Sequence, residues 1–293
     1  MRIYIANKMT GLYNFNFDWF DRARDYLISL GHDPVSPADL DRVEGFDGDG
    51  EVPANMSLEN CLRRDFAAIC DGVEAVAFGP HWADSRGARA ERIMGQAIGC
   101  SMWRVDPDIN SFYKEITIGL AGYARAGKDT VAKMVTEYEF EQRSFAAPLK
   151  DCLYALNPLA LDYEKTTIQD IVDARGWEDA KTYPEIRSLL QRLGTEAGRN
   201  VLGQNIWVDA LFNAPSNGRI VISDVRFPNE ATAIKLRGGL VWRVERPGYG
   251  PVNTHSSETA IDDFDYDGVI VNDGDLGQLQ VRVKEIVHAA IAH

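Results

Sequence analysis

The sequence predicts an α/β protein built from two parallel-sheet, three-layer domains in series. Short apolar runs alternate with segments whose apolar residues recur at helical spacing, which is typical of a parallel sheet covered by helices. A polar stretch at 106–114 separates two such regions, and a glycine-rich loop opens the first helix of the second region. The length of 293 residues also suits about two domains.

The first region covers residues 1–105 and alternates strands with helices. RIYIA, Arg2–Ala6, predicts a short strand, and the apolar spacing in 17–31 predicts a helix that ends at Gly31. The Asp- and Gly-rich tract 39–50 predicts a loop. The remaining predicted elements are a strand at 33–37, a helix capped by Ser57 that ends near Cys70, a strand at 73–80, a helix at 85–99 and a strand at 100–105.

The second region repeats the pattern from residue 115 onward. The run 116–122 predicts a strand, and a helix is expected from about Gly127. Further strands are predicted at Arg219–Val225, Leu240–Arg246 and Asp267–Asp273, with a long helix through 187–199. The predicted organisation is therefore a domain at 1–105, a linker at 106–114 and a second domain at 115–293.

Composition limits the partners of the chain. The formal net charge of −13 argues against a nucleic acid polymer as a partner, because such binding needs clustered Lys and Arg, but small phosphorylated ligands need only local donors. The four cysteines form no C-x-x-C pair, so reduced thiols are expected rather than zinc or disulfides. No apolar run reaches the ~18 residues of a membrane span, and the first residues do not read as a signal peptide, so a cytoplasmic location is expected.

The stretch GYARAGKDT, Gly122–Thr130, predicts a phosphate-binding loop. Its glycines permit close backbone approach, and the helix that follows presents free N–H groups to phosphate. Lys128 would reach the terminal phosphates of ATP, whereas Asp129 stands where Ser or Thr usually contacts Mg²⁺. Asp129 would then hold the metal through water, or Thr130 would contact phosphate. The expected ATP-binding residues are Gly122, Arg125, Ala126, Gly127, Lys128, Asp129 and Thr130.

Four more segments follow in the order found in one kinase family. They are FAAPLK (145–150), LLQRLGTEAGR (189–199), ISDVRFPNEA (222–231) and HSSE (255–258). Together with the loop they resemble the deoxynucleoside monophosphate kinases of tailed phages, within the P-loop kinases. The resemblance implies a P-loop kinase fold and ATP- and Mg²⁺-dependent phosphorylation of a deoxynucleoside monophosphate. It also implies that an aspartate after the lysine is usual in this family.

Chemistry and resemblance together suggest roles for the polar residues of these segments. Asp224 is expected to assist the metal or orient the acceptor, and Arg226 to stabilise phosphate bidentately. Each arginine has the alternative of being a solvated surface charge, Glu196 that of a helix salt bridge, and His255 that of a structural residue. The expected acceptor-binding residues are Arg187, Gln191, Glu196, Arg199, Arg226, His255 and Glu258.

The first region carries its own pattern, S-x-G-x-x-x-E, at Ser85, Gly87 and Glu91. A hydroxyl, a glycine and the free N–H groups of a helix start make an anion site, to which Arg86 and Arg89 add positive charge. Glu91, one to two turns along the helix, would lie near whatever carries that anion. An amphipathic helix with a polar start is the alternative.

Residues 1–105 resemble the nucleoside 2-deoxyribosyltransferase superfamily, which includes deoxynucleoside 5′-monophosphate N-glycosidases. The opening YIANKMTG, residues 4–11, is similar to a branch that usually reads Y-[IL]-A-G-P-M-T-G, with Asn-Lys in place of Gly-Pro and with Met9 and Gly11 retained. The resemblance implies a flavodoxin- or Rossmann-like fold, and site roles for four residues. These are Glu91 as nucleophile, Ser85 as 5′-phosphate ligand, Asp65 as second acid and Tyr4 as the tyrosine that ends the first strand. Glycosidic cleavage needs such a carboxylate and a second acid.

The whole sequence therefore predicts a bifunctional deoxynucleotide enzyme, phage-encoded and located in the host cytoplasm. One domain would phosphorylate a deoxynucleoside monophosphate, and the other would hydrolyse the glycosidic bond of one. The alternatives are a kinase with a non-catalytic N-terminal binding or oligomerisation domain, a nucleotide-sensing protein without turnover, and a kinase for another small acceptor. A homodimer or higher homo-oligomer is expected.

Overall fold

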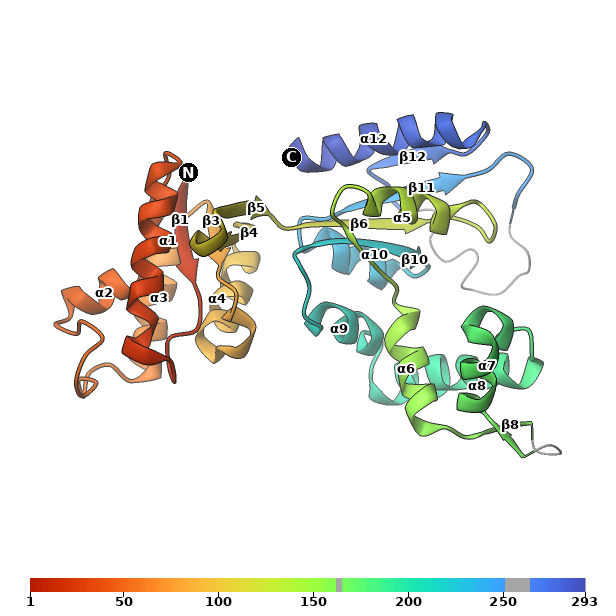
Figure 1. The fold of residues 1–293 in the computed structure, drawn as a ribbon, viewed down its shortest axis with the longest axis horizontal. Coiled ribbons are helices and arrows are strands. Elements are labelled where there is room, and N and C mark those ends of the chain that lie inside the picture. Colours follow the sequence, from red (N-terminus) through yellow and green to blue (C-terminus); the bar gives the residue numbers. More distant parts are fainter. Residues whose placement is uncertain (162–164, 251–263, 293) are drawn as a thin grey trace. The chain divides into compact units, whose positions relative to one another are not determined.

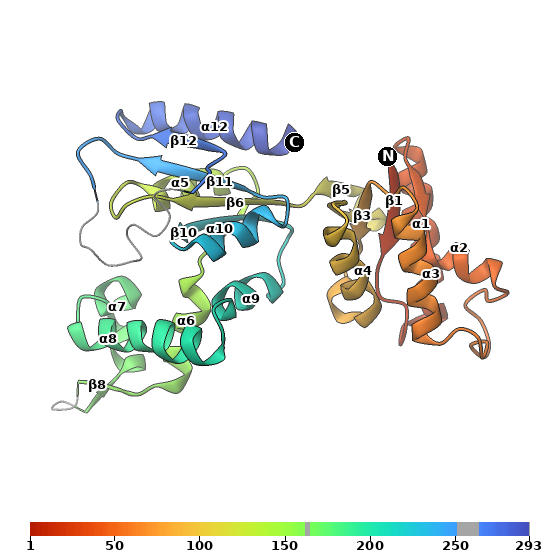
Figure 2. The same cartoon turned by 180° about the vertical axis from the view of Figure 1, so that it is seen from behind.

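A computed structural model describes residues 1–161, 165–250 and 264–292 of the chain. The chain divides into two compact units, Met1–Ile116 and Thr117–His293. Figures 1 and 2 show the elements of each unit from opposite sides. Each unit contains its own five-stranded sheet, so the predicted α/β class is confirmed.

The sheet of unit 1 has the strand order β2-β1-β3-β4-β5. The first four strands are parallel to their neighbours, and β5 is antiparallel to β4. The strands are β1 (Arg2–Ala6), β2 (Asp33–Val35), β3 (Ala75–Phe78), β4 (Ser101–Asp106) and β5 (Ser111–Lys114). The helices are η1 (Tyr13–Asn16), α1 (Phe17–Ser29), α2 (Pro37–Val43), α3 (Leu58–Cys70), η2 (Trp82–Asp84), α4 (Arg86–Ala97) and η3 (Pro107–Ile109).

Alternation along β1 explains the three layers of unit 1. Successive strand residues point to opposite faces of a sheet. Ile3 and Ile5 join the cluster formed with α1, whereas Tyr4 and Ala6 join the cluster on the opposite face, which includes residues of α3 and α4. Tyr4 therefore belongs to the face covered by α3 and α4.

The structure differs from the sequence prediction at two places in unit 1. The predicted loop 39–50 begins as a helix, because α2 starts with a proline at its first turn and its Arg42 pairs with Asp21 of α1 and with Asp39. The predicted linker 106–114 is not a free connector. It forms η3 and β5, and the pairing of β5 with β4 makes it part of the unit 1 sheet.

The sheet of unit 2 has the order β12-β11-β6-β10-β7. The β12–β11, β11–β6 and β10–β7 pairs are parallel. The strands are β6 (Ile116–Ala121), β7 (Glu141–Arg143), β10 (Arg219–Val225), β11 (Leu240–Glu245) and β12 (Gly268–Val271). In Figure 1, α5 (Lys128–Thr136) and α12 (Leu276–Ala292) lie on one side of this sheet, and α9 (Ile206–Asn213) and α10 (Pro228–Lys235) lie on the other.

A helical part of unit 2 has a separate apolar cluster. It contains α6 (Ala146–Leu156), α7 (Ile168–Ala180), α8 (Pro184–Gln191) and the hairpin of β8 (Leu159–Leu161) with β9 (Thr166–Thr167). The long helix predicted through 187–199 is α8 followed by a π-helix, η5 (Arg192–Leu202). The indole N–H of Trp207 donates to the Gly194 carbonyl at 2.9 Å, and a Cβ at Gly198 would lie 2.7 Å from that indole. The wider helix is thus packed directly against Trp207.

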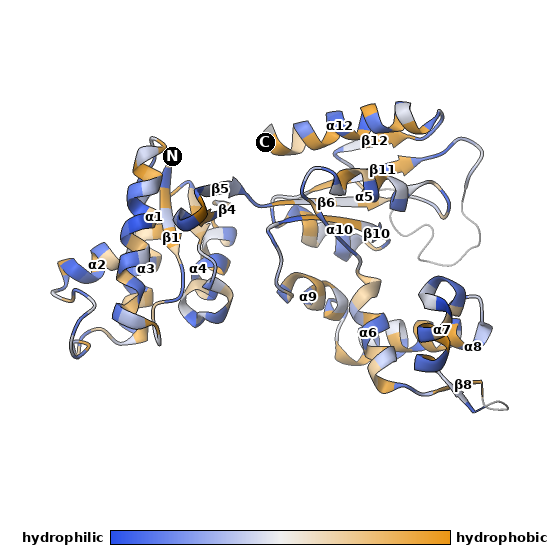
Figure 3. Ribbon diagram, viewed as in Figure 1, coloured by the Kyte–Doolittle hydropathy of each residue, from blue (hydrophilic) through white to orange (hydrophobic). Residues whose placement is uncertain are grey.

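Hydropathy follows the layers of both units. Figure 3 shows β6, β11 and β12 as largely hydrophobic, while α12 carries both hydrophobic and hydrophilic residues along its length. Within the described residues, no helix combines the length and the apolar character needed to span a membrane.

Candidate functional sites

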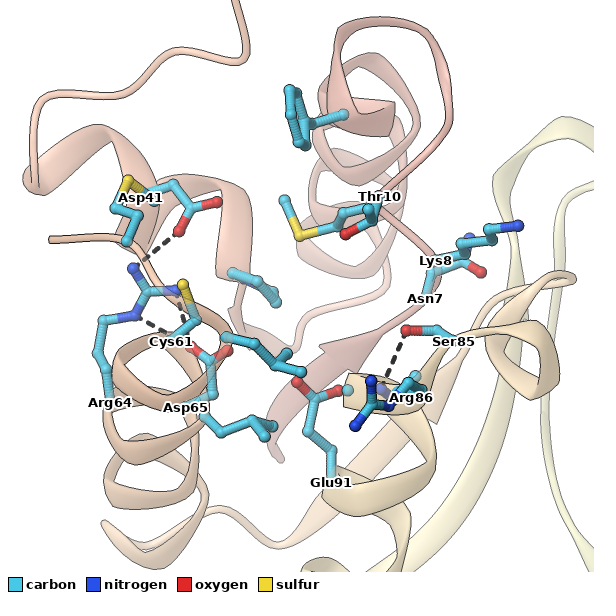
Figure 4. A pocket seen from close by; sticks show the side chains of 18 of the residues that line it. Asn7, Lys8, Thr10, Asp41, Cys61, Arg64, Asp65, Ser85, Arg86 and Glu91 are labelled. Carbon is cyan, nitrogen blue, oxygen red and sulfur yellow. Dashed lines mark hydrogen bonds and ion pairs between the residues drawn. The ribbon is translucent and has the colours of Figure 1, made fainter. Parts of the chain in front are cut away.

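A cavity of about 540 Å³ lies in unit 1 among α2, α3, the start of α4 and the segment after β1. Figure 4 shows carboxylates from three helices around it. Glu91 and Asp65, the two predicted acids, both line the cavity although 26 sequence positions separate them. The other predicted residues that line it are Ser85, Gly87 and Met9.

Glu91 is a buried acid of this cavity. Its residue is 5% exposed, and the Tyr4 hydroxyl donates to Glu91 Oε1 at 3.1 Å. Burial raises the pKa of Glu91 to about 8, and the nearby charge of Asp65 adds to this rise. Burial also raises the pKa of Tyr4 well above its usual value, so the phenol stays a hydrogen-bond donor. Tyr4 does not line the cavity but orients the residue that does.

Asp65 is held by its neighbour in sequence, Arg64. The Arg64 Nε and Nη2 groups donate to Asp65 Oδ1 at 3.0 and 2.9 Å. Burial raises the pKa of Asp65 to about 6, while the charge of Arg64 opposes the rise. Asp65 thus pairs with a neighbouring arginine, and that neighbour is not Arg63, which is exposed and pairs with Glu59 one turn earlier.

The helix start at Ser85 forms one end of the cavity. Ser85 caps α4, because its Oγ accepts from the Ala88 N–H at 3.2 Å, and Arg86 and Gly87 follow it along the cavity wall. Asn7, in the segment that follows β1, is 5% exposed. Its Oδ1 accepts from the His81 N–H at 3.1 Å, and its Nδ2 has no hydrogen-bond partner. Free backbone donors, a buried amide and Arg86 therefore favour an anion at this end.

The opposite end of the cavity is apolar. The lining side chains there come from η1, α2, α3 and the segment between α2 and α3, and they are Phe15, Pro37, Phe46, Val52, Met56, Leu58 and Leu62. The rings of Phe15 and Phe46 meet edge to face at 5.2 Å between centroids. Such a wall suits a flat, partly apolar group. The sequence prediction missed this wall, because no local spacing connects η1 with residues 46–62.

Not all the predicted residues of unit 1 reach the cavity. Gly11 is exposed and does not line it. Arg89 also points elsewhere, since its Nη1 donates to the Ala83 carbonyl at 2.9 Å. Arg64 and Asp41 do line the cavity but were not predicted, because a charged residue on a helix gives no sequence signal of burial.

The predicted phosphate loop of unit 2 connects β6 to α5. Gly122 has φ +138°, and a Cβ there would lie 2.3 Å from the Val244 carbonyl oxygen, so only glycine fits. Asn272 Nδ2 donates to the Ala126 carbonyl at 3.0 Å and fixes the loop from β12. Lys128 Nζ donates to the carbonyls of Gly122 and Tyr123 at 2.7 and 2.8 Å, which places its charge inside the loop.

The other loop residues fall into two groups. Ala126 is buried, whereas Arg125, Asp129 and Thr130 are exposed at the start of α5. Exposure leaves Asp129 and Thr130 open to a ligand or to water. Gly127 has φ +103° and forms the N-cap of α5.

Asp224 at the end of β10 anchors the start of α6. Its Oδ1 accepts from the Phe145 N–H at 2.8 Å, and its Oδ2 accepts from the Ala146 N–H at 3.0 Å. Burial raises the pKa of Asp224, although these two backbone donors oppose the rise. The carboxylate therefore links the sheet to the segment FAAPLK.

Arg199 is not a solvated surface charge. Its Nη2 donates to Glu230 Oε1 at 2.8 Å, and its guanidinium carbon lies 3.9 Å from the centroid of the Phe227 ring. Glu230 Oε2 accepts from the backbone N–H groups of Arg226 and Phe227 at 2.8 and 3.1 Å. Burial raises the pKa of Glu230 to about 7. The sequence prediction missed Glu230 and Phe227 as the residues that hold Arg199.

The remaining predicted acceptor residues are not brought together by contacts in unit 2. Arg187, Gln191, Glu196 and Arg226 are exposed. Glu196 pairs with Arg192 one turn earlier at 3.8 Å, which is the helix salt bridge considered as its alternative. His255 and Glu258 lie outside the described residues. In the described part of the chain, no three His, Cys, Asp or Glu side chains cluster as a metal site.

Comparisons with known proteins found a matching family model for each part of the chain. Residues 160–283 match the family described as deoxynucleotide monophosphate kinase, and residues 1–103 match DUF4406, described as a domain of unknown function. The protein "Putative deoxynucleotide monophosphate kinase" of Acanthamoeba polyphaga mimivirus is 29% identical over an alignment of length 198, and the match covers 60% of this chain and 97% of the viral protein.

Two further proteins match part of this chain. The deoxynucleotide monophosphate kinase of Enterobacteria phage T4 is 26% identical over an alignment of length 233, and the match covers 57% of this chain and 96% of the phage protein. Among solved structures, a dephospho-CoA kinase from Campylobacter jejuni aligns over 60% of this chain and 98% of its own, with 14% identity and a TM-score of 0.35. The resemblance to deoxynucleoside monophosphate kinases is thus confirmed for the C-terminal part of the chain, whose residues 160–283 match the deoxynucleotide monophosphate kinase family.

Proposed function

We propose that this chain is a bifunctional deoxynucleotide enzyme. Unit 2 would phosphorylate a deoxynucleoside monophosphate with ATP, in keeping with its family and with the names of its relatives. Unit 1 would hydrolyse the N-glycosidic bond of a deoxynucleoside 5′-monophosphate. The observation that carries the second activity is the pair of buried acids, Glu91 and Asp65, in one cavity between an anion-binding helix start and an apolar wall.

The three regions of the cavity match the three parts of a nucleotide. The α4 N-terminus with Ser85 and Arg86 would bind the 5′-phosphate, the acids would face the deoxyribose, and the Phe15–Phe46 wall would contact the base. With the base against the Phe15–Phe46 wall, the anomeric carbon of the deoxyribose would lie beside Glu91.

Cleavage needs one ionised and one protonated acid in the cavity. The pKa of Glu91 is about 8 and that of Asp65 is about 6, so the pair holds one proton between these values. When substrate binds, the proton would pass to Asp65, and the Glu91 carboxylate would attack the anomeric carbon. The leaving base takes the proton from Asp65, and water, deprotonated by Asp65, then hydrolyses the glycosyl-enzyme ester. Tyr4 would hold Glu91 in line during both steps.

The kinase site of unit 2 would work by positioning and charge stabilisation. The loop 122–127 and the α5 N-terminus would bind the ATP phosphates, and Lys128 would exchange its two carbonyl partners for phosphate oxygens. Arg226 would contact the acceptor phosphate. Arg199, held by Glu230 and Phe227, would present a fixed guanidinium to the phosphoryl group in transfer.

Magnesium fits this site only as an ion held mainly by phosphate and water. Mg²⁺ usually keeps several waters and takes one or two carboxylates. Asp129 is exposed beside Lys128 and fits a water-mediated contact, whereas Asp224 already uses both oxygens for backbone N–H groups. When bound with ATP, the ion would neutralise charge on the phosphates. Asp224 would act by positioning α6.

Product analysis with each deoxynucleoside monophosphate separately, with and without ATP and Mg²⁺, tests both activities. Free base without ATP is expected for a substrate of unit 1, and diphosphate only with ATP for a substrate of unit 2. A panel that includes modified bases and gives diphosphate but never free base would refute the glycosidase.

One observation favours a second candidate function for unit 1. Glu91 with a pKa of about 8 is mainly neutral at pH 7 before ligand binds, and a neutral acid suits binding as well as catalysis. A kinase with a non-catalytic nucleotide-binding domain would show nucleotide binding to unit 1 without base release. Calorimetric titration of Glu91→Gln and of the unchanged protein with the same nucleotide separates the two candidates. The glycosidase requires that only the unchanged protein releases base.

A further inference from the structure

Arg64 links α2 and α3 at the wall of the unit 1 cavity. Its Nη1 lies 2.8 Å from Asp41 Oδ1 of α2, and the same atom lies 3.6 Å from Glu44 Oε1. Its Nε and Nη2 both reach Asp65 Oδ1 on α3. The Arg64 side chain is only 18% exposed, and those of Asp41 and Asp65 are 7% and 8% exposed. Figure 4 shows the guanidinium between the two aspartates.

The contact between Arg64 and Asp65 is not a consequence of helix geometry. Adjacent residues on a helix point about 100° apart, and side chains three or four positions apart are the ones that meet. Arg63 follows that rule with Glu59. Arg64 instead folds back onto its neighbour, because the carboxylates of Asp41 and Glu44 hold the other side of its guanidinium.

The charged and titratable groups around this pair come from four elements. Cys61 lies on α3 itself, Tyr4 on β1, Asp41 and Glu44 on α2, and Glu91 on α4. Arg64 is the cation in direct contact with Asp41 and Asp65, while Lys8 and Arg86 line the same cavity. Without Arg64, Asp65 and Asp41 would lose the cation that they share.

We propose that Arg64 is a positioning residue that fixes Asp65 through one carboxylate oxygen, favours its ionised form before substrate binds, and so holds it in place for the proton transfers of the cavity. This role deepens the function proposed for unit 1 and rests on it. Asp41 is the anchor that sets the direction of the guanidinium. Arg64 does not contact the substrate atoms that react.

The charge of Arg64 has a direct consequence for titration. Burial raises the pKa of Asp65 to about 6, and Arg64 opposes that rise. An opposite charge within hydrogen-bond distance lowers a carboxyl pKa by about 1–3 units. Removal of the guanidinium should therefore shift the lower pKa of the acid pair upward. The acid limb, which is the fall in the rate of base release at low pH, should then begin at a higher pH.

The test compares Arg64→Met, Arg64→Lys and the matched control Arg63→Met in the full chain. Arg64→Met should move the acid limb up by about one pH unit or more. It should also lower the kcat of base release by about 10–100-fold. Arg64→Lys keeps the positive charge but loses the two-point contact with Asp65. Its acid limb should therefore stay close to that of the unchanged protein, whereas its kcat should fall nearly as far as in Arg64→Met. Arg63→Met should match the unchanged protein, and the kinase rate of every variant should stay constant.

A spectroscopic measurement keeps this inference separate from the glycosidase proposal. The ¹³C chemical shift of the Asp65 carboxyl, assigned by comparison with Asp65→Asn, should titrate at higher pH in Arg64→Met whether or not base is released. Absence of base release from the unchanged protein would refute the proposed activity alone. An Asp65 titration that is the same in Arg64→Met and in the unchanged protein would overturn the role of Arg64, and so would a lower melting temperature with an unchanged pH profile.

Discussion

At the scale of single residues, the function proposed for unit 1 depends on acids that the fold encloses. Glu91 and Asp65 are both nearly buried, and the described structure pairs one with a phenol and the other with a guanidinium. Burial disfavours the charged form of an acid, which is why both pKa values lie above their ordinary range. Such enclosure costs stability when the acid ionises.

Glu91→Gln should therefore stabilise unit 1 at high pH. The pKa of Glu91 in the fold, about 8, exceeds its ordinary value of 4.5. The stability that the protonated acid contributes is fully present below pH 4.5 and is lost as the pH rises through about 8. Glutamine does not ionise, so the variant should gain ~4 kcal/mol at about pH 8 and nothing at about pH 4. Hydrogen exchange of the β1 and α4 amides measures this. An equal gain at both pH values would contradict the titration.

Lys128→Met should remove kinase activity without affecting unit 1. The lysine places one charge inside the loop 122–127, and phosphoryl transfer depends on such charges. Diphosphate formation should fall at least about 100-fold. Base release should be unchanged. Lys133→Met, on the same helix α5, is the matched control and should keep the kinase rate.

At the scale of elements, helix starts place most of the proposed ligand groups. α4 begins at the cavity and α5 at the phosphate loop, and the start of α6 is fixed by Asp224. A helix N-terminus presents unpaired N–H groups and partial positive charge, so the same device serves both units.

Two N-cap serines offer a matched test of that device. Ser57 caps α3 and Ser85 caps α4 through equivalent Oγ contacts, at 3.3 Å and 3.2 Å, to the backbone N–H three residues on. Alanine at either position should cost about 1 kcal/mol of stability. Only Ser85→Ala should also raise the KM for the nucleotide in base release, because Ser57 does not line the cavity. Equal KM values in the two variants would remove Ser85 from the phosphate site.

At the scale of the whole molecule, two compact units share one chain. All the cavity residues belong to residues 1–116, and all the phosphate-loop contacts belong to residues 117–293. The residues proposed for each activity therefore come from one unit alone. A chain of this kind would suit the removal of one monophosphate while another advances to the diphosphate.

The two units should then prefer different bases. Steady-state assays of base release and of diphosphate formation, with the same panel of deoxynucleoside monophosphates, measure both preferences. Glu91→Gln and Lys128→Met serve as controls that silence one unit at a time. If both units prefer the same base, the proposed division between removal and phosphorylation fails.

The sequence by itself determined the two α/β units, most strands and the helix starts, because these depend on local spacing. Strands Arg2–Ala6 and Arg219–Val225 match the prediction residue for residue, and Ser57 and Ser85 cap the predicted helices. The kinase motifs also led to the family that residues 160–283 match. The site residues stay proposals, although the pattern S-x-G-x-x-x-E did locate one end of the cavity.

Only the tertiary structure decided how the charged side chains pair. Arg64 joins Asp41 to Asp65, and Arg199 joins Glu230 under Phe227, across sequence gaps that no periodicity marks. The sequence also did not predict β5, because its polar composition is typical of a linker, and only the pairing with β4 shows that it is a strand. A charge in a sequence predicts a solvated surface, and only the packing of distant elements around it reveals the partner that makes its burial possible.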